Sequence, residues 1–231
     1  MSTNRRVLVT GGGSGIGEAT CTVLADHGWD AIAADVRRPT GGIALDVTDE
    51  IGWAHVLEQT GPLAGLVCCA GVRARSMIVD TTVEEFRRHL DVNVVGTWLG
   101  IRALLRNHVA GTMSAIVTMA SVNVTIAVPG QAHYVASKGA IAALTKAAAL
   151  EGAPLGVRVN SIAPGPIRTP MTAERLDDPA QLQWLTTRVA LGRVGEPREI
   201  AEVVQFLLSD ASSYMTGEVL YVDGGWAANA V

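Results

Sequence analysis

The chain has 231 residues, of which 48% are hydrophobic and 17% are charged, with a formal net charge of −4. This length suits one large domain or two small ones, and the scattered arginine pairs form no basic face for nucleic acid. No apolar run approaches the roughly 18 residues of a membrane-spanning helix, and no long apolar segment follows the N-terminal arginines as it would in a signal peptide.

The chain holds three cysteines, Cys21, Cys68 and Cys69. The last two are adjacent, and this spacing suits neither a zinc site nor a disulfide framework. Since the sequence shows no export signal, we expect reduced thiols, a cytoplasmic protein and no bound metal.

Short apolar runs alternate with longer segments of helical spacing. We expect strands at 6–10, 30–35, 42–46, 65–70, 114–120, 157–163 and 218–223. Between them we expect helices at 15–27, 49–59, 81–108, 133–151 and 197–209, and a broken helical patch at 172–190. Apolar strands separated by helices predict a doubly wound, Rossmann-like α/β fold with a parallel sheet covered on both faces. No repeat, linker or low-complexity tract divides the chain, so we expect a single domain over 1–231.

The first expected strand runs directly into the glycine-rich segment TGGGSGIGEA. Gly11, Gly15 and Gly17 fit the pattern G-x-x-x-G-x-G, in which glycine allows a sharp turn and a close approach to a ligand. The helix that begins near Gly15 points free N–H groups at this loop, which favours the pyrophosphate of a dinucleotide. The alternative is a tight turn without a ligand, but the position at the first strand-to-helix turn favours cofactor binding.

Asp35 closes the second expected strand, where a carboxylate can bind both ribose hydroxyls of NAD and repel the extra phosphate of NADP. Arg37 and Arg38 follow directly, and guanidinium groups bind phosphate well. We favour NAD over NADP. Asp46 closes the third expected strand, where it either meets an adenine edge or caps the following helix.

Tyr134 and Lys138 stand four residues apart on an expected helix and therefore share a face. A free phenol has a pKa of about 10, and a nearby ammonium group favours the phenolate. A tyrosine tuned in this way can act as a general acid or base on an alcohol or carbonyl oxygen. The alternative is an ordinary surface pair, which these two residues alone would favour.

Two further polar residues change this balance. Ser121 lies just past the strand expected at 114–120, on the sheet edge that also carries the glycine loop, where its hydroxyl can donate to a substrate oxygen. Asn93 lies in the middle of an expected helix, although asparagine is a poor helix former. We expect it either to hold a kink and a bound water or to satisfy its own helix.

With these motifs the sequence resembles the short-chain dehydrogenase/reductase family, in its compact single-domain form, over nearly the whole chain. The segment TGGGSGIG is similar to the family's T-G-x-x-x-G-x-G, and YVASK to its Y-x-x-x-K, with Ser121 at the usual spacing. The segment DVNVVGTW is similar to the one that carries the family's catalytic asparagine. VNSIAPGPIRTPM and the C-terminal segment 192–225 are similar to the family's nicotinamide-facing and terminal segments.

The resemblance implies a role for each matched residue. Tyr134 would be the acid/base, Lys138 would lower its pKa and hold the nicotinamide ribose, and Ser121 would position the substrate oxygen. Asn93 would complete a proton relay, while Ile167 and Thr169 would hold the carboxamide of the cofactor. The residue patterns and the resemblance together assign cofactor contacts to Gly11, Ser14, Gly15, Ile16, Gly17, Asp35, Asp46, Val47, Ala70, Gly71, Tyr134, Lys138, Pro164, Gly165, Ile167 and Thr169.

The resemblance also implies seven parallel strands and a homotetramer joined through the helices near 81–108 and 133–151. One departure concerns the family's N-N-A-G, which is replaced here by CCAG, with Cys68 and Cys69 in place of both asparagines. We expect weaker cofactor binding or a looser turn from this replacement, and no loss of activity.

The sequence predicts an NAD-dependent enzyme that interconverts a secondary alcohol and a ketone. We expect a medium-sized, mostly apolar substrate, alicyclic ones included, because the three segments that should line its site contribute Val124, Met171, Leu176, Leu182, Trp184 and Leu185. Arg73 and Arg75 would grip a carboxylate or phosphate if they faced the site, but solvent exposure is the favoured expectation for both.

Two alternatives stay open. One is a 3-oxoacyl thioester reductase that uses NADPH, with Arg37 and Arg38 on the cofactor and Arg168 and Arg175 in a docking patch for an acidic carrier protein. The other is a nucleotide-sensing protein without catalysis, although such a protein would be free to lose the serine, tyrosine and lysine that this chain retains.

Overall fold

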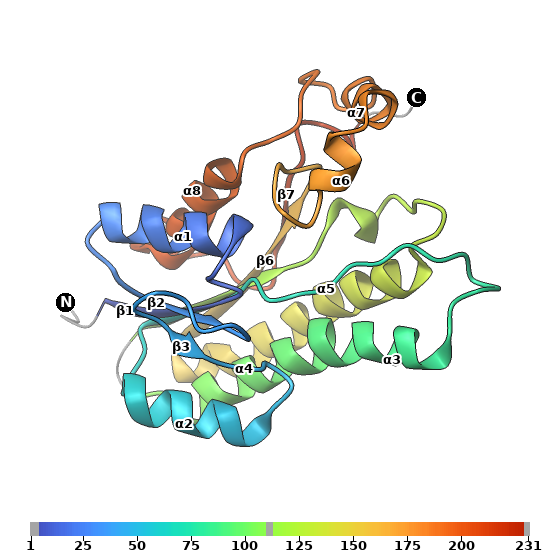
Figure 1. Ribbon diagram of the computed structural model, residues 1–231. Coiled ribbons are helices and arrows are strands. Elements are labelled where there is room, and N and C mark those ends of the chain that lie inside the picture. The colour runs from blue at the N-terminus through green and yellow to red at the C-terminus, as the bar shows by residue number, and fades with distance from the viewer. Residues whose placement is uncertain (1–4, 110–112, 229–231) are drawn as a thin grey trace.

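The computed structural model describes residues 5–109 and 113–228 (Figure 1). Within these two ranges, seven strands form one parallel sheet in the order β3-β2-β1-β4-β5-β6-β7. The strands are β1 (Arg6–Thr10), β2 (Asp30–Asp35), β3 (Ile43–Ala44), β4 (Gly65–Cys68), β5 (Ser114–Met119), β6 (Val157–Pro164) and β7 (Val219–Val222). The predicted seven-stranded, Rossmann-like sheet is confirmed. The strand order changes direction at β1 and β4, so a ligand is expected beyond the carboxyl ends of these strands.

Helices cover both faces of the sheet, as Figure 1 shows. On one face lie α1 (Gly15–Asp26) and α8 (Pro197–Leu208), and on the other lie α2 (Glu50–Thr60), α4 (Gly96–Arg106) and α5 (Ala132–Gly152). Helix α3 (Val83–Leu90) leads into α4. Two short helices, α6 (Ala173–Leu176) and α7 (Pro179–Thr186), replace the broken patch predicted at 172–190.

The alternation of side chains along β1 explains why both faces carry a core. Val7 and Val9 pack with Leu24 of α1, whereas Leu8 points to the opposite face and packs with Trp53 of α2. Successive side chains of a strand point to opposite faces, so an apolar run such as this one must be covered twice. The sheet is therefore held between two layers of helices.

The helix predicted at 81–108 is interrupted at its centre. A π-helical turn, Asp91–Val95, separates α3 from α4, and Asn93 is its middle residue. Such turns add one residue to a helical turn and are frequent at functional sites. The helix is thus interrupted at Asn93, by a π-helical turn.

The third strand is the element that differs most from its predicted length. Only Ile43–Ala44 pair in β3, with Ala34 and Asp35 of β2, because this strand forms the edge of the sheet and has one neighbour. Among the described residues, no helix combines the length and apolar character needed to cross a membrane.

Candidate active site

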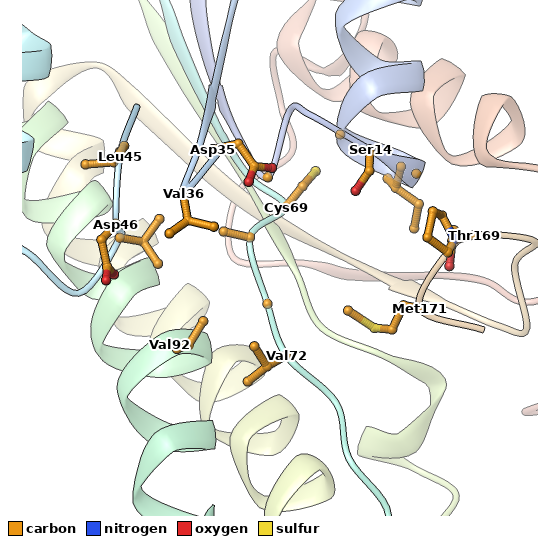
Figure 2. Close-up of a pocket in the computed structure, with 18 of the residues that line it drawn as sticks. Ser14, Asp35, Val36, Leu45, Asp46, Cys69, Val72, Val92, Thr169 and Met171 are labelled. Carbon is orange, nitrogen blue, oxygen red and sulfur yellow. The ribbon is translucent and has the colours of Figure 1, made fainter. Parts of the chain in front are cut away.

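A long cavity of about 440 Å³ lies along the carboxyl ends of β1, β2 and β4. In Figure 2, Asp46 and Val36 lie at one end, Thr169 and Met171 at the other, and Asp35 between them. The residues predicted to bind a cofactor that line this cavity are Gly11, Ser14, Gly15, Ile16, Gly17, Asp35, Asp46, Val47, Ala70, Gly71 and Thr169. An elongated cleft of this size suits a dinucleotide.

The loop between β1 and α1 closes tightly on its neighbours. A Cβ atom on Gly17 would lie 2.1 Å from the carbonyl oxygen of Gly11, and one on Gly11 would lie 2.7 Å from the backbone nitrogen of Ala70. Gly11 also has a φ of 65°, which favours glycine. Ser14 precedes α1 without a side-chain cap, so the first N–H groups of the helix are left for an anion. The cradle therefore fits a diphosphate.

The carboxylate of Asp35 faces this loop. Its Oδ2 accepts a hydrogen bond from the Gly13 N–H at 3.2 Å. Arg38 is turned elsewhere, since its Nε donates to the Gly42 carbonyl oxygen at 2.9 Å. Neither Arg37 nor Arg38 is among the residues that line the long cavity. The charge at the end of β2 that meets a ligand is therefore negative.

Asp46 lies at the opposite wall of the cavity. Its Oδ1 accepts hydrogen bonds from the N–H of Thr48 at 2.9 Å and from its hydroxyl at 2.7 Å. Helix α2 is capped by Asp49 instead, which accepts from the N–H of Ile51 at 3.0 Å. The helix-capping alternative for Asp46 is therefore wrong, and the residue faces the cavity.

A smaller cavity of about 80 Å³ adjoins the long one, and Met171 lines both. Ser121 and Tyr134 line the smaller cavity. The ammonium nitrogen of Lys138 lies 5.5 Å from the centroid of the Tyr134 ring and donates to the Met119 carbonyl oxygen at 2.7 Å. The end of β5 and the first turns of α5 thus bring these three residues together.

Burial shifts the pKa values of both Tyr134 and Lys138. Burial raises the pKa of Tyr134 above its ordinary value of 10, while a hydrogen bond with Ser121 and the charge of Arg73 act in the opposite direction. Burial also lowers the pKa of Lys138 to about 8. The sequence assigned the lowering of the phenol pKa to Lys138; in the structure the net pKa is raised, and Ser121 and Arg73 oppose the effect of burial. Before a cofactor adds its charge, this raised pKa favours the neutral form of Tyr134.

Asn93 is fully buried and fastens two segments together. Its Nδ2 donates to the carbonyl oxygen of Val72 at 3.0 Å and to the hydroxyl of Ser137 at 2.9 Å. Its Oδ1 accepts from the N–H of Val72 at 2.8 Å. The amide therefore fixes the segment after β4 against α5, one residue before Lys138.

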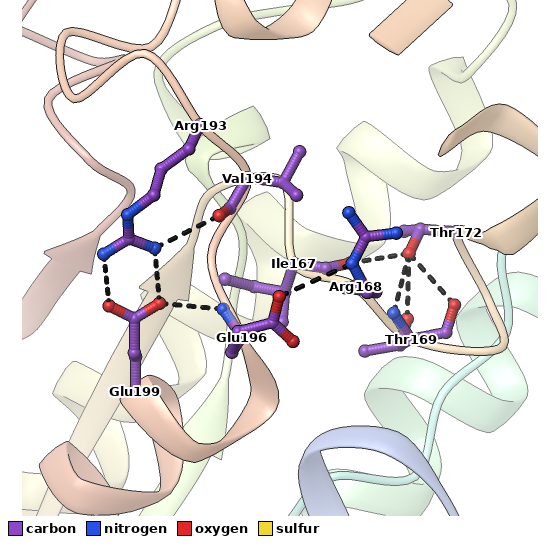
Figure 3. Close-up of polar contacts among 8 residues, drawn as sticks. All are labelled: Ile167, Arg168, Thr169, Thr172, Arg193, Val194, Glu196 and Glu199. Carbon is purple, nitrogen blue, oxygen red and sulfur yellow. Dashed lines mark hydrogen bonds and ion pairs between the residues drawn. The ribbon is translucent and has the colours of Figure 1, made fainter. Parts of the chain in front are cut away.

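The segment after β6 is held from two sides (Figure 3). The hydroxyl of Thr172 donates to the carbonyl oxygen of Ile167 at 2.6 Å and accepts from the N–H of Thr169 at 3.0 Å. The N–H of Arg168 donates to the carbonyl oxygen of Gly195 at 2.9 Å. This bracing aims Thr169 into the long cavity.

The loop against which this segment rests is itself fixed by ion pairs (Figure 3). Arg193 donates twice to the carboxylate of Glu199, at 2.8 and 2.7 Å, and Glu199 also accepts from the N–H of Glu196 at 2.8 Å. Arg168, which was considered above for a carrier-docking patch, pairs with Glu196 at 3.4 Å, and both side chains stay about half exposed.

Five residues predicted to bind the cofactor are not among those lining the long cavity. Gly165 and Tyr134 line the smaller cavity instead. The other three, Lys138, Pro164 and Ile167, are buried, and Ile167 lines a separate cavity of about 400 Å³. Buried residues of this kind act on a ligand through backbone groups or through neighbours.

The CCAG segment keeps its turn without the two asparagines. The N–H of Cys69 donates to the Thr10 carbonyl oxygen at 3.2 Å, and that of Ala70 donates to the Thr10 hydroxyl at 3.3 Å. Cys68 packs in the core and Cys69 lines the long cavity. The turn expected to be loose is therefore tied to β1.

The three thiols should be slow to react in the folded protein. Burial raises the pKa of Cys21 to about 11 and that of Cys68 to about 12, and it also raises the pKa of Cys69. At pH 8 the thiolate fraction is then more than about 100-fold below that of an ordinary thiol with a pKa near 8.5. We expect iodoacetamide at pH 8 to label the native protein at least roughly 10-fold more slowly than the unfolded chain, as mass spectrometry would show. Rapid labelling of one native cysteine would contradict this account.

Sequence reasoning missed part of both cavities. The additional residues that line the long cavity are Val36, Leu45, Cys69, Val72, Arg88, Val92 and Pro170. Gln131 lines the small cavity, and its position one helical turn before Tyr134 would have pointed to it. Of the predicted apolar lining, Met171, Leu176 and Leu185 are present, and Arg73 and Arg175 lie beside them.

Comparisons with known proteins agree with this geometry. A family model described as enoyl-(acyl carrier protein) reductase matches residues 11–227. A cyclopentanol dehydrogenase of Comamonas sp. is 38% identical, and the match covers 96% of this chain and 97% of that protein. A 2,5-dichloro-2,5-cyclohexadiene-1,4-diol dehydrogenase of Sphingobium indicum is 35% identical, with 97% of each chain covered. The crystal structure of a putative 2-deoxy-D-gluconate 3-dehydrogenase of Agrobacterium tumefaciens with bound NADP has a TM-score of 0.91 at 32% identity and covers 98% of each chain.

Proposed function

Because the chain belongs to the short-chain dehydrogenase/reductase family and is an NAD(P)-dependent alcohol dehydrogenase, we propose that it uses NAD to interconvert a secondary alcohol and a ketone. The observation that carries this proposal is the pair of adjoining cavities that share Met171. The long one has the shape and lining for a dinucleotide, and the small one presents Ser121 and Tyr134 to a substrate.

The cofactor would be held from one end of the long cavity to the other. The N-terminus of α1 would hold the diphosphate, Asp35 the ribose hydroxyls, and Asp46 with Val47 the adenine edge. Thr169, with Ile167 behind it, would hold the carboxamide of the nicotinamide. When bound, the nicotinamide supplies the acceptor or donor of a hydride.

The preference for NAD rests on the charges at the end of β2. Asp35 would repel the extra phosphate of NADP, and Arg38 already donates to the carbonyl oxygen of Gly42. One related structure holds NADP, and another, a 4-hydroxyisoleucine dehydrogenase, holds NADH. Because the fold accepts both cofactors, we expect the side chains at this strand end to decide between them.

During alcohol oxidation Tyr134 would accept the hydroxyl proton and Ser121 would hold the substrate oxygen as its charge changes. Accepting a proton near neutral pH requires a phenol pKa below 10. Arg73 acts in that direction, and the ammonium group of Lys138, close to the ring, has the sign to add to it.

Asn93 would complete a proton relay toward Lys138. A Cβ atom on Gly71 would lie 3.2 Å from the Oδ1 of Asn93 and 3.8 Å from the Nζ of Lys138, so both groups border the same point. The side-chain amide of Asn93 forms hydrogen bonds with Val72 and Ser137, and these bonds fix the π-helical turn beside Lys138.

A medium-sized, mostly apolar alcohol, including an alicyclic one, suits the small cavity. Val122, Leu176 and Leu185 contribute apolar lining. Two relatives carry the names of enzymes that oxidise cyclopentanol and a cyclohexadiene diol, both of which are cyclic secondary alcohols.

We also propose a homotetramer in the cytoplasm. Helices α3, α4 and α5 carry exposed apolar side chains, with Phe86 37%, Trp98 42% and Leu150 78% exposed, as expected of an interface. Sedimentation should give the mass of four chains, and a monomer at micromolar concentration would contradict the assembly.

The cytoplasmic location is supported by the three cysteines, which are unpaired in the structure, as expected in a reducing compartment.

A substrate panel tests the reaction class. We expect NAD to be reduced with cyclopentanol, cyclohexanol or cyclic diols, and we expect no oxidation of NADPH with a 3-oxoacyl thioester. Faster turnover of the thioester with NADPH would favour the reductase alternative. Tight cofactor binding without turnover of either class would favour the nucleotide-sensing alternative.

A further inference from the structure

The small cavity carries an excess of positive charge. Arg73, from the segment after β4, and Arg175, from α6, both line it. The charge of Arg75 also acts on Arg175, since it helps to lower the pKa of that guanidinium group. Among the described residues, no carboxylate forms an ion pair with any of these three arginines.

Arg175 is held in place by aromatic rings. Its guanidinium carbon lies 5.0 Å from the centroid of the Trp184 ring, and Trp184 packs edge-on against Trp226 with centroids 6.1 Å apart. The Nε of Arg175 is buried and has no hydrogen-bond partner. Burial, and then repulsion from Arg75 and Arg73, lowers its pKa to about 10. The guanidinium group of Arg175 is thus held in position, and no carboxylate of the described residues pairs with it.

Gln131 adds a second polar group that has no partner. It lines the same cavity, is 2% exposed, and its Nε2 makes no hydrogen bond. A buried amide without a partner is costly, and such groups in native proteins call for an explanation. An acceptor atom of a bound ligand would satisfy it.

On the basis of the proposed function, we infer that the substrate is a hydroxy acid whose carboxylate binds between Arg73 and Arg175 and accepts a hydrogen bond from Gln131. Two guanidinium forks match the planar, bidentate geometry of a carboxylate. The apolar residues beside it would then contact the ring or chain that joins the carboxylate to the reacting alcohol.

The matched pair of substrates that tests this inference is 3-hydroxycyclohexanecarboxylate and its methyl ester, which differ in charge. We expect the acid to have a kcat/KM roughly 10- to 100-fold higher than the ester with NAD. Arg175→Met should abolish this preference by raising the KM for the acid. Arg73 is unsuitable for this test because it also acts on Tyr134.

Arg188→Met is the control variant. The guanidinium group of Arg188 lies over the same tryptophan, 4.1 Å from the Trp184 centroid, but Arg188 is not among the residues that line the cavity. This variant should keep the preference for the acid. An ester that reacts as fast as the acid would overturn the inference and leave the proposed reaction standing.

A binding measurement separates the two proposals if neither compound is oxidised. With NAD present, calorimetry should detect binding of cyclohexanecarboxylate that R175M weakens and R188M does not. This result without turnover of any alcohol of the panel would keep the carboxylate site and defeat the proposed function. Binding that is independent of Arg175, or no binding, would overturn the inference, and tighter binding of cyclohexyl phosphate would overturn the choice of carboxylate.

Discussion

Replacing Tyr134 by Phe should lower kcat/KM for alcohol oxidation by roughly 10³-fold, the range expected when a general acid or base is removed. The variant keeps the ring and loses the hydroxyl that meets Ser121 in the small cavity. We expect the melting temperature and the affinity for NADH to stay close to those of the parent protein, because Tyr134 is not among the residues that line the long cavity.

Tyr214→Phe is the matched control, since this tyrosine is fully exposed and should tolerate the same change. The measurement is kcat/KM for the best alcohol of the panel, with cofactor binding and thermal unfolding recorded for each variant. If Y134F retained the parent rate, Tyr134 would not be the acid/base and the proposed mechanism would be wrong.

Replacing Asp35 by Asn should shift the cofactor preference toward NADPH by about 100-fold. Asparagine keeps an oxygen for the Gly13 N–H and removes the negative charge. We expect NADH to bind about 10-fold more weakly, because charged hydrogen bonds to the ribose are lost. We expect NADPH to bind about 10-fold more tightly, because the repulsion of its phosphate is lost.

Asp46→Asn provides the comparison, because it removes the same charge from the opposite wall of the cavity. This variant should change both affinities alike and leave their ratio near that of the parent. Fluorescence titrations with NADH and NADPH give the four constants. A parent protein that prefers NADPH, or an unchanged ratio in D35N, would mean that Arg37 and Arg38 control the site.

Much of the fold could be predicted because local patterns determine it. Each apolar run lies between two layers of helices, so its hydrophobic residues indicate a buried strand. The predicted strand ends therefore lie within about two residues of the observed ones. The neighbourhood of Ser121, Tyr134 and Lys138 could be predicted too, since helical spacing and the common edge of a parallel sheet bring them together.

The charges of the small cavity could not be predicted in the same way. Arg73 and Arg175 reach it from separate elements, and the broken pattern at 172–190 gives no register for α6 and α7. Whether Arg73 is exposed depends on how this segment packs over the loop after β4. Asp46 shows a related limit, because a carboxylate before a helix can cap it, and the structure gives that position to Asp49.

The pKa of Tyr134 shows what spacing cannot give. Lysine four residues away predicts a lowered pKa, yet desolvation of the phenol is the larger effect in the structure. Spacing gives the neighbours of a group, whereas burial depends on every element that packs around it.

Deuterium transfer from substrate to cofactor would show whether a hydride passes directly between them. The alcohol of the panel with the highest turnover is prepared with deuterium on its carbinol carbon and incubated with the protein and NAD, and the NADH formed is analysed by mass spectrometry. We predict one deuterium on each NADH molecule and slower turnover than with the unlabelled alcohol. Unlabelled NADH, or ketone formed without reduction of NAD, would contradict direct hydride transfer between substrate and cofactor.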